Sequence, residues 1–144
     1  KFTTKEVLKL RNFCKKKYFK LFISNDIRLA IKLNLNGAYF PSFNRDFNHL
    51  SFKLKKEFLL IGSAHNISEI RVKNKQGIKL IFLSSIFKKN KNYLGLYRFM
   101  NLANLIKTKI IALGGINQNN YKLLRFVKIK GFGGISFFQK KRPL

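Results

Sequence analysis

The sequence predicts an α/β fold in which parallel strands alternate with helices. Short apolar runs rich in Phe, Ile and Leu recur along the 144 residues, and segments with helical periodicity separate them. Strands joined by crossover helices run parallel and have both sheet faces covered, which explains why the runs do not alternate with polar residues. Six runs are predicted as strands: Lys20–Ser24, Gly37–Phe40, Phe58–Ser63, Lys79–Ser84, Lys109–Gly114 and Gly134–Phe138.

A helix precedes the first predicted strand. Val7, Leu10 and Cys14 fall at helical spacing between Thr4 and Lys17. In a parallel α/β sheet such a helix packs on a strand that comes before it. We therefore expect the sequence to begin partway through its domain. No linker or low-complexity block divides residues 1–144, so we expect one domain, present in part.

Further helices are expected between the later runs. One apolar face begins at Ile27, and another extends from Leu96 to Ile106. Asn66 followed by Glu69 resembles a capping box, which predicts a helix start. The segment from Pro41 to Lys56 is the least regular and is predicted as a loop with a short helix.

The composition is strongly basic. Thirty-one Lys and Arg residues against five Asp and Glu give a formal charge of +26, which attracts phosphate, nucleic acid or an anionic membrane surface. The same abundance of Lys, Asn, Ile and Phe is also what an AT-rich genome imposes on its proteins. No nucleic-acid recognition motif is present, and the phenylalanines are expected in the core, so a specific nucleic-acid partner is not predicted.

Other classes of protein find little support in the sequence. The single cysteine, Cys14, has no partner for a disulfide and no second thiol for a metal site. No apolar run approaches the roughly 18 to 20 residues that span a bilayer, and no secretory signal or transit peptide is recognisable. A cytoplasmic location without membrane partners is expected, and the sequence does not indicate an oligomeric state.

Ligands of parallel α/β folds bind beyond the carboxyl ends of the strands, so the residues that follow each run are the candidate site. The segment 111–117 carries a glycine pair, Gly114 and Gly115, before a predicted helix. Paired glycines let backbone N–H groups approach an anion, and a helix N-terminus adds favourable partial charge, so a phosphate cradle is one interpretation. A glycine pair that merely turns the chain is the other.

Three more segments at strand ends allow both a structural and a functional role. Asn25 and Asp26 suit a helix N-cap, and Asp26 could also hold a magnesium ion that bridges phosphates. His65, two residues after Ser63, suits either a helix start or proton transfer near neutral pH. Lys91 lies in a lysine-rich loop that could contact pyrophosphate or simply be solvated.

Taken in chain order, these segments resemble the thiamine-phosphate synthase family, which also contains thiazole tautomerase-like members. The resemblance covers nearly the whole chain, and it depends on the order and spacing of several motifs rather than on any single one. The similar segments are "LFISNDIRLAIKLNLNGAYF", "LLIGSAHNISEI", "IFLSSIFKK", "IIALGGINQNN" and "GFGGISFF".

The resemblance implies a TIM-type barrel of which the six runs are the third to eighth strands, with the first two missing. It implies a transferase of thiamine biosynthesis that joins hydroxymethylpyrimidine diphosphate to thiazole phosphate and releases pyrophosphate. It assigns Ser63, His65 and Lys91 to catalysis and Asp26 to magnesium. It assigns substrate and phosphate binding to four further positions: Lys1, Asn25, Gly114 and Gly115.

The chain also departs from the family pattern. Asn44 stands where the family has a second acidic magnesium ligand, so magnesium binding is weakened or lost. Gln139 replaces a serine after the last strand, and Lys89 and Asn90 replace Thr and Ser in the phosphate loop. A thiazole tautomerase-like relative without transferase activity is therefore the main alternative, and a basic RNA-binding protein is the less favoured one.

Overall fold

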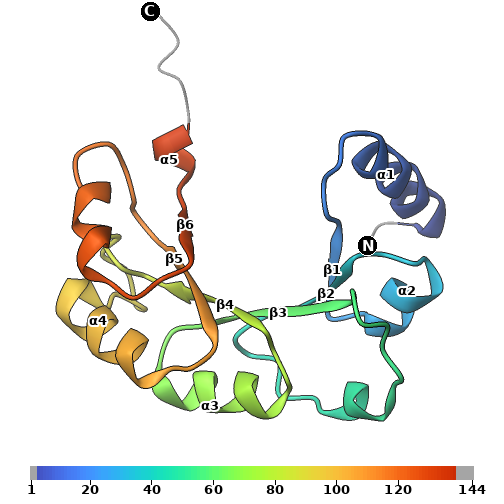
Figure 1. Ribbon diagram of the computed structural model, residues 1–144, viewed down its shortest axis with the longest axis horizontal. Coiled ribbons are helices and arrows are strands. Elements are labelled where there is room, and N and C mark those ends of the chain that lie inside the picture. The colour runs from blue at the N-terminus through green and yellow to red at the C-terminus, as the bar shows by residue number, and fades with distance from the viewer. Residues whose placement is uncertain (1–2, 139–144) are drawn as a thin grey trace, which may run out of the picture.

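Six segments of the chain form one parallel sheet. The structure is a computed structural model that describes residues 3–138. The strands follow one another in chain order across the sheet, which is curved, as Figure 1 shows. They are β1 (Phe22–Ser24), β2 (Gly37–Phe40), β3 (Leu59–Ala64), β4 (Leu80–Ser84), β5 (Lys109–Leu113) and β6 (Gly131–Gly133). The predicted α/β class with parallel strands is confirmed.

Five strands lie where the sequence predicts them, and the prediction for the sixth is wrong. Residues Ile135–Phe138 form a short helix, α5, whereas β6 lies just before them. The centre of β6, Phe132, pairs with Ala112 of β5. A Cβ added to Gly133 would lie 2.8 Å from Cδ2 of Leu113, so the close approach of the two strands favours glycine there.

Three helices and two 3₁₀ helices connect the strands, and one further helix precedes β1. The helices are α1 (Thr4–Lys16), α2 (Ile27–Lys32), α3 (Ile67–Lys75) and α4 (Gly95–Leu105). Thr3 and Glu6 form a capping box at the start of α1. Asn66 caps α3 by accepting from the backbone N–H of Glu69, as predicted. The 3₁₀ helices are η1 (Asn48–Ser51), inside the predicted irregular segment, and η2 (Tyr121–Phe126).

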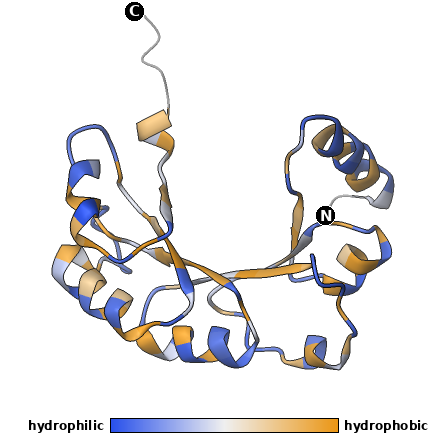
Figure 2. Cartoon of the chain, viewed as in Figure 1, coloured by the Kyte–Doolittle hydropathy of each residue, from blue (hydrophilic) through white to orange (hydrophobic). Residues whose placement is uncertain are grey.

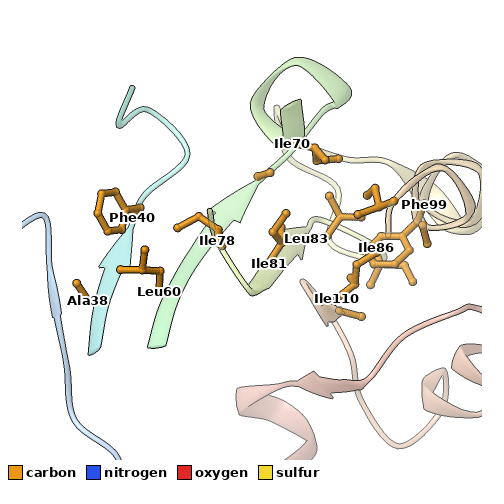
Figure 3. Close-up of a cluster of buried hydrophobic side chains, with 14 of the residues drawn as sticks. Ala38, Phe40, Leu60, Ile70, Ile78, Ile81, Leu83, Ile86, Phe99 and Ile110 are labelled. Carbon is orange, nitrogen blue, oxygen red and sulfur yellow. The ribbon is translucent and has the colours of Figure 1, made fainter. Parts of the chain in front are cut away.

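The core lies between the convex face of the sheet and the helices that cover it. Strand residues such as Leu60, Ile81 and Ile110 pack with Ile70 of α3 and Phe99 of α4 (Figure 3). Figure 2 shows apolar residues along the strands and polar residues on the outer sides of the helices. Burial of this face supplies most of the driving force for folding.

The aromatic residues are only partly buried. Phe40 and Phe99 are core residues, as expected for phenylalanines in this sequence. The expectation that the phenylalanines lie in the core is wrong for six of those that the structure describes, which are exposed: Phe13, Phe19, Phe43, Phe47, Phe126 and Phe138. They flank strands or lie at a helix end, where hydrophobicity alone does not determine burial.

Both ends of the sheet are open within residues 3–138. There, β1 pairs only with β2 and β6 only with β5, and Figure 1 shows the two strands at opposite ends of the curve. A cavity of about 810 Å³ lies beside β1 and extends to α1 and α2. Leu10 of α1, predicted with Val7 and Cys14 on one apolar face, lines this cavity and is 47% exposed. In the described part of the chain, no helix is both long enough and apolar enough to span a bilayer.

Candidate functional site

The carboxyl ends of the strands form one edge of the sheet, which we call the rim. Because all six strands are parallel and adjacent in order, the residues that follow them meet at this edge. The predicted site residues at the ends of β1, β3 and β5 therefore lie along this edge: Asn25, Asp26, Ser63, His65, Gly114 and Gly115. Lys91 belongs to the loop after β4, and Lys1 lies outside the described residues.

Ser63 points to the concave face of the sheet and is buried. Its Oγ accepts a hydrogen bond of 2.8 Å from the hydroxyl of Tyr39 on β2. The Tyr39 ring meets Phe82 of β4 edge-on, with centroids 6.3 Å apart. Register supports a shared face, since Ser63 is paired with Phe82 and lies two residues beyond Ile61, the partner of Tyr39. Tyr39 was missed in the sequence because it stands inside an apolar run.

His65 is oriented by Ser84 at the end of β4. Its Nδ1 lies 2.9 Å from the carbonyl oxygen of Ser84 and 3.1 Å from the hydroxyl. A carbonyl only accepts, so Nδ1 carries the proton and the neutral imidazole keeps its lone pair on Nε2. The backbone N–H of His65 donates to Glu69 Oε2 at 2.7 Å. No pattern in the sequence indicates the contact with Ser84, which lies 19 residues away.

The glycine pair packs tightly against the loop after β4. Gly114 and Gly115 have φ values of 103° and 75°, and the Gly114 carbonyl accepts from the N–H groups of Phe87 and Lys88. A Cβ on Gly115 would lie 2.6 Å from the Lys88 nitrogen. The expected helix start directly after the pair is wrong, because η2 begins only at Tyr121. The turn and the packing both require glycine, while the role in phosphate binding stays a prediction.

The loop that carries Lys91 is closed by its own hydrogen bonds. The N–H of Ser85 donates to the Asn92 carbonyl at 2.9 Å, and its hydroxyl donates to the Lys88 carbonyl at 2.8 Å. The N–H of Leu94 donates to the Ser85 carbonyl at 2.9 Å. These bonds hold an exposed Lys91 on a defined loop next to the glycine pair.

At the β1 end of the rim, Asp26 caps α2 and Asn25 bonds to Asn44. The Asp26 carboxylate accepts from the backbone N–H of Leu29 at 2.9 Å, so its predicted capping role is confirmed. Asn25 has a φ of 60°, and its Oδ1 accepts from Asn44 Nδ2 at 2.8 Å. Residues 3–138 contain no group of three or more His, Cys, Asp or Glu side chains that could hold a metal ion.

A buried polar cluster of Lys73, Gln76 and His49 lies behind Asn44. Lys73 and Gln76 have no exposed surface, and His49 is 3% exposed. The His49 Nε2 lies 2.7 Å from the Gln76 carbonyl. Burial lowers the pKa of the Lys73 ammonium to about 8, a change that nearby Glu69 partly opposes. Neither Lys73 nor Gln76 was expected at the site, since both resemble ordinary polar residues of a helix end.

Comparison with known proteins gives a consistent result. A family model described as thiamine monophosphate synthase matches residues 2–138. A thiamine-phosphate synthase of Fusobacterium nucleatum is 28% identical over 137 residues, which are 92% of this chain and 66% of that protein. One of Prochlorococcus marinus is 31% identical over 133 residues, 88% of this chain and 36% of that protein. The chain thus spans less than two thirds of the length of these relatives.

Solved structures support the same fold. A thiamine phosphate pyrophosphorylase from Pyrococcus furiosus superposes with a TM-score of 0.72 at 16% identity, over 92% of this chain and 67% of the other. FabK from Thermotoga maritima superposes with a TM-score of 0.68 at 12% identity, over 92% of this chain and 47% of the other. The six strands therefore correspond to part of a TIM-type barrel, and the family match over residues 2–138 shows that this chain belongs, as a divergent member, to the thiamine monophosphate synthase family.

Proposed function

We propose that the whole protein is a thiamine-phosphate synthase, which joins hydroxymethylpyrimidine diphosphate to thiazole phosphate and releases pyrophosphate. One observation carries the proposal. Within a chain that matches this family, Asn25, Asp26, Ser63, His65 and Gly115 lie along one rim of a parallel sheet, next to a concave face. Such a rim is where parallel β/α folds bind phosphorylated ligands.

Completion of the barrel is part of this proposal. A TIM-type barrel has eight strands, and the described residues supply six with an open edge at each end. The cavity beside β1 has an apolar lining that includes Leu10, Leu21 and Phe22. A strand that paired with β1 would cover this lining and give α1 the surface on which crossover helices pack.

Magnesium, which the family implies, fits this chain only in part. Asp26 is the one carboxylate at the β1 end of the rim that the resemblance assigns to the ion, and Asn44 replaces the other. Magnesium often uses one or two carboxylates together with substrate phosphates and water. Asp26 would therefore hold the ion jointly with a bound diphosphate, where the ion would neutralise charge on the leaving group.

The protein's own groups would bind and orient the substrates. Departure of pyrophosphate leaves a pyrimidine cation that the thiazole nitrogen captures, so the catalytic task is to stabilise charge developing on the leaving oxygen. Lys91 would supply a cation on the loop after β4, and backbone N–H groups near Gly115 would hold the thiazole phosphate. Ser63, whose hydroxyl accepts from Tyr39, can donate its own proton to a pyrophosphate oxygen.

The geometry of His65 favours a second candidate, a thiazole tautomerase-like activity. Its Nδ1 is committed to Ser84, so Nε2 is free to accept a proton at the rim. Moving a proton on a thiazole phosphate needs no diphosphate and no metal ion. This candidate agrees with the replacement of an acidic ligand by Asn44.

Assays with the whole purified protein distinguish the two activities. The transferase produces thiamine phosphate from both substrates in the presence of magnesium. Isomerisation of the thiazole phosphate without formation of thiamine phosphate would reject the transferase and establish the tautomerase.

Variants of Asp26 test its role in the transferase. Asp26→Asn keeps an N-cap for α2, because asparagine caps as well as aspartate, but removes the carboxylate. We expect Asp26→Asn and Asp26→Ala both to abolish magnesium-dependent turnover, whereas only Asp26→Ala also lowers stability, by about 1 kcal/mol. Unchanged turnover in Asp26→Asn would reject the proposed role of Asp26.

A further inference from the structure

The donor and the acceptor of each hydrogen bond behind the rim can be assigned in turn, starting from Lys73. An ammonium group only donates, so both of its partners must accept. Lys73 Nζ lies 2.8 Å from the backbone carbonyl of Asn44 and 3.0 Å from Oε1 of Gln76. Because Oε1 of Gln76 is the acceptor, the amide of Gln76 is fixed with its NH₂ group on the other side.

The Gln76 NH₂ group in turn faces only acceptors around Asn44. Its Nε2 lies 2.8 Å from the Asp46 carbonyl, 3.1 Å from Oδ1 of Asn44 and 3.3 Å from the Asn44 carbonyl. The backbone N–H of Asp46 also donates to Oδ1 of Asn44, at 2.9 Å. Two donors therefore converge on one branch of the Asn44 amide, which must be the oxygen.

The same assignment of donor and acceptor applies to the bond between Asn44 and Asn25 on the rim. With its oxygen directed at Gln76, Asn44 presents its NH₂ group to Asn25, 2.8 Å from Oδ1. Asn25 must accept this bond, so its own NH₂ group occupies the other branch of the amide. Asn25 is exposed, and this NH₂ group is a hydrogen-bond donor at the β1 end of the rim.

We propose that Lys73 and Gln76 are positioning residues that set the polarity of Asn25, that is, which branch of its side-chain amide faces the ligand. With this polarity, the Asn25 NH₂ group at this end of the rim donates a hydrogen bond directly to a phosphate oxygen of the ligand. A carboxylate at position 44 would act in the opposite way. It only accepts, so it would draw the Asn25 NH₂ group toward itself and leave the Asn25 oxygen at the rim, where it suits a cation. The inference rests on the proposed binding of phosphorylated substrates at this rim.

The chemical environment agrees with a donor role. Lys73 has no exposed surface, and its side-chain nitrogen lies behind Asn44. This nitrogen supplies N–H donors there whether or not the group is charged. All polar atoms of Asn44 have partners, since its own N–H donates to the Pro41 carbonyl at 3.0 Å. If the Asn44 amide turned over, its NH₂ group would face the N–H donors of Gln76 and Asp46, so the observed orientation is the stable one.

Nuclear magnetic resonance of the unaltered chain tests the polarity directly. The side-chain NH₂ signals of Asn25 and Asn44 are identified by their loss in Asn25→Asp and Asn44→Asp. We expect contacts in the spectrum between the Asn44 NH₂ protons and Asn25, and between the Gln76 NH₂ protons and Asn44. Titration with inorganic pyrophosphate in metal-free buffer should shift the Asn25 NH₂ signal.

Two matched variants then test the function of that polarity. Asn44→Asp reverses the acceptor pattern next to Asn25, while Asn48→Asp makes the same change in charge four residues away, at the start of η1. We expect Asn44→Asp to weaken metal-free pyrophosphate binding by about tenfold more than Asn48→Asp, the effect of a lost hydrogen bond to a charged group. Added magnesium should restore binding in Asn44→Asp more than in the unaltered chain.

The outcomes separate this inference from the proposed function. An Asn25 NH₂ signal that does not move with bound pyrophosphate, or equal losses in the two variants, overturns the inference. If the signal moves as expected but the whole protein does not form thiamine phosphate, the transferase fails while the polarity of Asn25 stands.

Discussion

Lys73 illustrates how a single buried residue links stability to pH. Its pKa falls from 10.5 to about 8 because burial penalises the ammonium. Between these two values the unfolded chain binds the proton and the folded chain releases it, so stability rises with pH in this window. Below about pH 8 both states carry the charge, and the burial penalty is fully present.

We therefore predict that the free energy of unfolding rises by up to about 3 kcal/mol between pH 8 and 10.5 through Lys73. Urea denaturation at several pH values measures it, with Lys73→Met as the reference that lacks the titrating group. The difference between the two proteins isolates Lys73 from the other lysines. A difference that does not change with pH would contradict the assigned burial penalty.

At the residue scale, sequence patterns identified the rim better than the contacts behind it. Asn25, Ser63 and His65 were predicted because they directly follow or end apolar runs, and parallel strands end at one edge. Tyr39 and Lys73 were not predicted. Ser63, the partner of Tyr39, lies 24 residues away along the chain, and Asn44, a partner of Lys73, lies 29 residues away, and no local spacing encodes such contacts.

At the scale of elements, the turn after β5 depends on glycine in a way that can be measured. Gly115 and Gly77 have nearly equal φ values, 75° and 72°. A Cβ on Gly115 would meet the Lys88 backbone, whereas a Cβ on Gly77 meets nothing within 4 Å. The two positions therefore share the backbone strain and differ in the steric contact.

We predict that Gly77→Ala lowers stability by about 1 kcal/mol, because a residue with a Cβ is strained in the left-handed backbone conformation. Gly115→Ala should cost at least about 1 kcal/mol more, because the loop after β4 must move away. Thermal or urea unfolding of both variants measures the difference. Equal losses would show that Lys88 and Gly115 are not in close contact.

Elements were predicted well where apolar pattern and length agreed. The strands β2 and β4 and the helix α1 lie at or within one residue of the predicted positions, since each has a regular pattern. The last strand was misplaced because β6 contains two glycines and one phenylalanine, and sheet pairing rather than propensity makes it a strand. The segment after the glycine pair forms a turn instead of the expected helix, because the side-chain oxygens of Asn117 and Asn120 accept hydrogen bonds from nearby backbone N–H groups.

At the scale of the whole molecule, the charge of +26 makes a distinct prediction. If the charge reflects composition rather than nucleic-acid recognition, RNA binding should be independent of sequence and fall steeply with salt. We expect retention on RNA at 50 mM salt to be lost by about 200 mM. Tight binding of one particular RNA at physiological salt would instead favour the RNA-binding alternative. A fluorescence anisotropy titration with two unrelated RNAs decides between them.

The order of the six strands also determines how the site is built. The sequence predicted the sheet class and the edge on which we expect ligands to bind, because alternation of strands and helices leaves few topologies. It did not predict how the concave face is lined, since Tyr39, Ser63 and Phe82 come from three strands whose register only the fold defines. The rim is thus a property of the assembled sheet rather than of any one motif.

A structure of the whole protein with thiamine phosphate bound tests the central claim most directly. The account predicts the ligand at the rim, with its phosphate within hydrogen-bond distance of the backbone near Gly115 and its pyrimidine side toward Asn25 and Ser63. A ligand bound away from the carboxyl ends of the strands, or no binding at millimolar concentration, would contradict it.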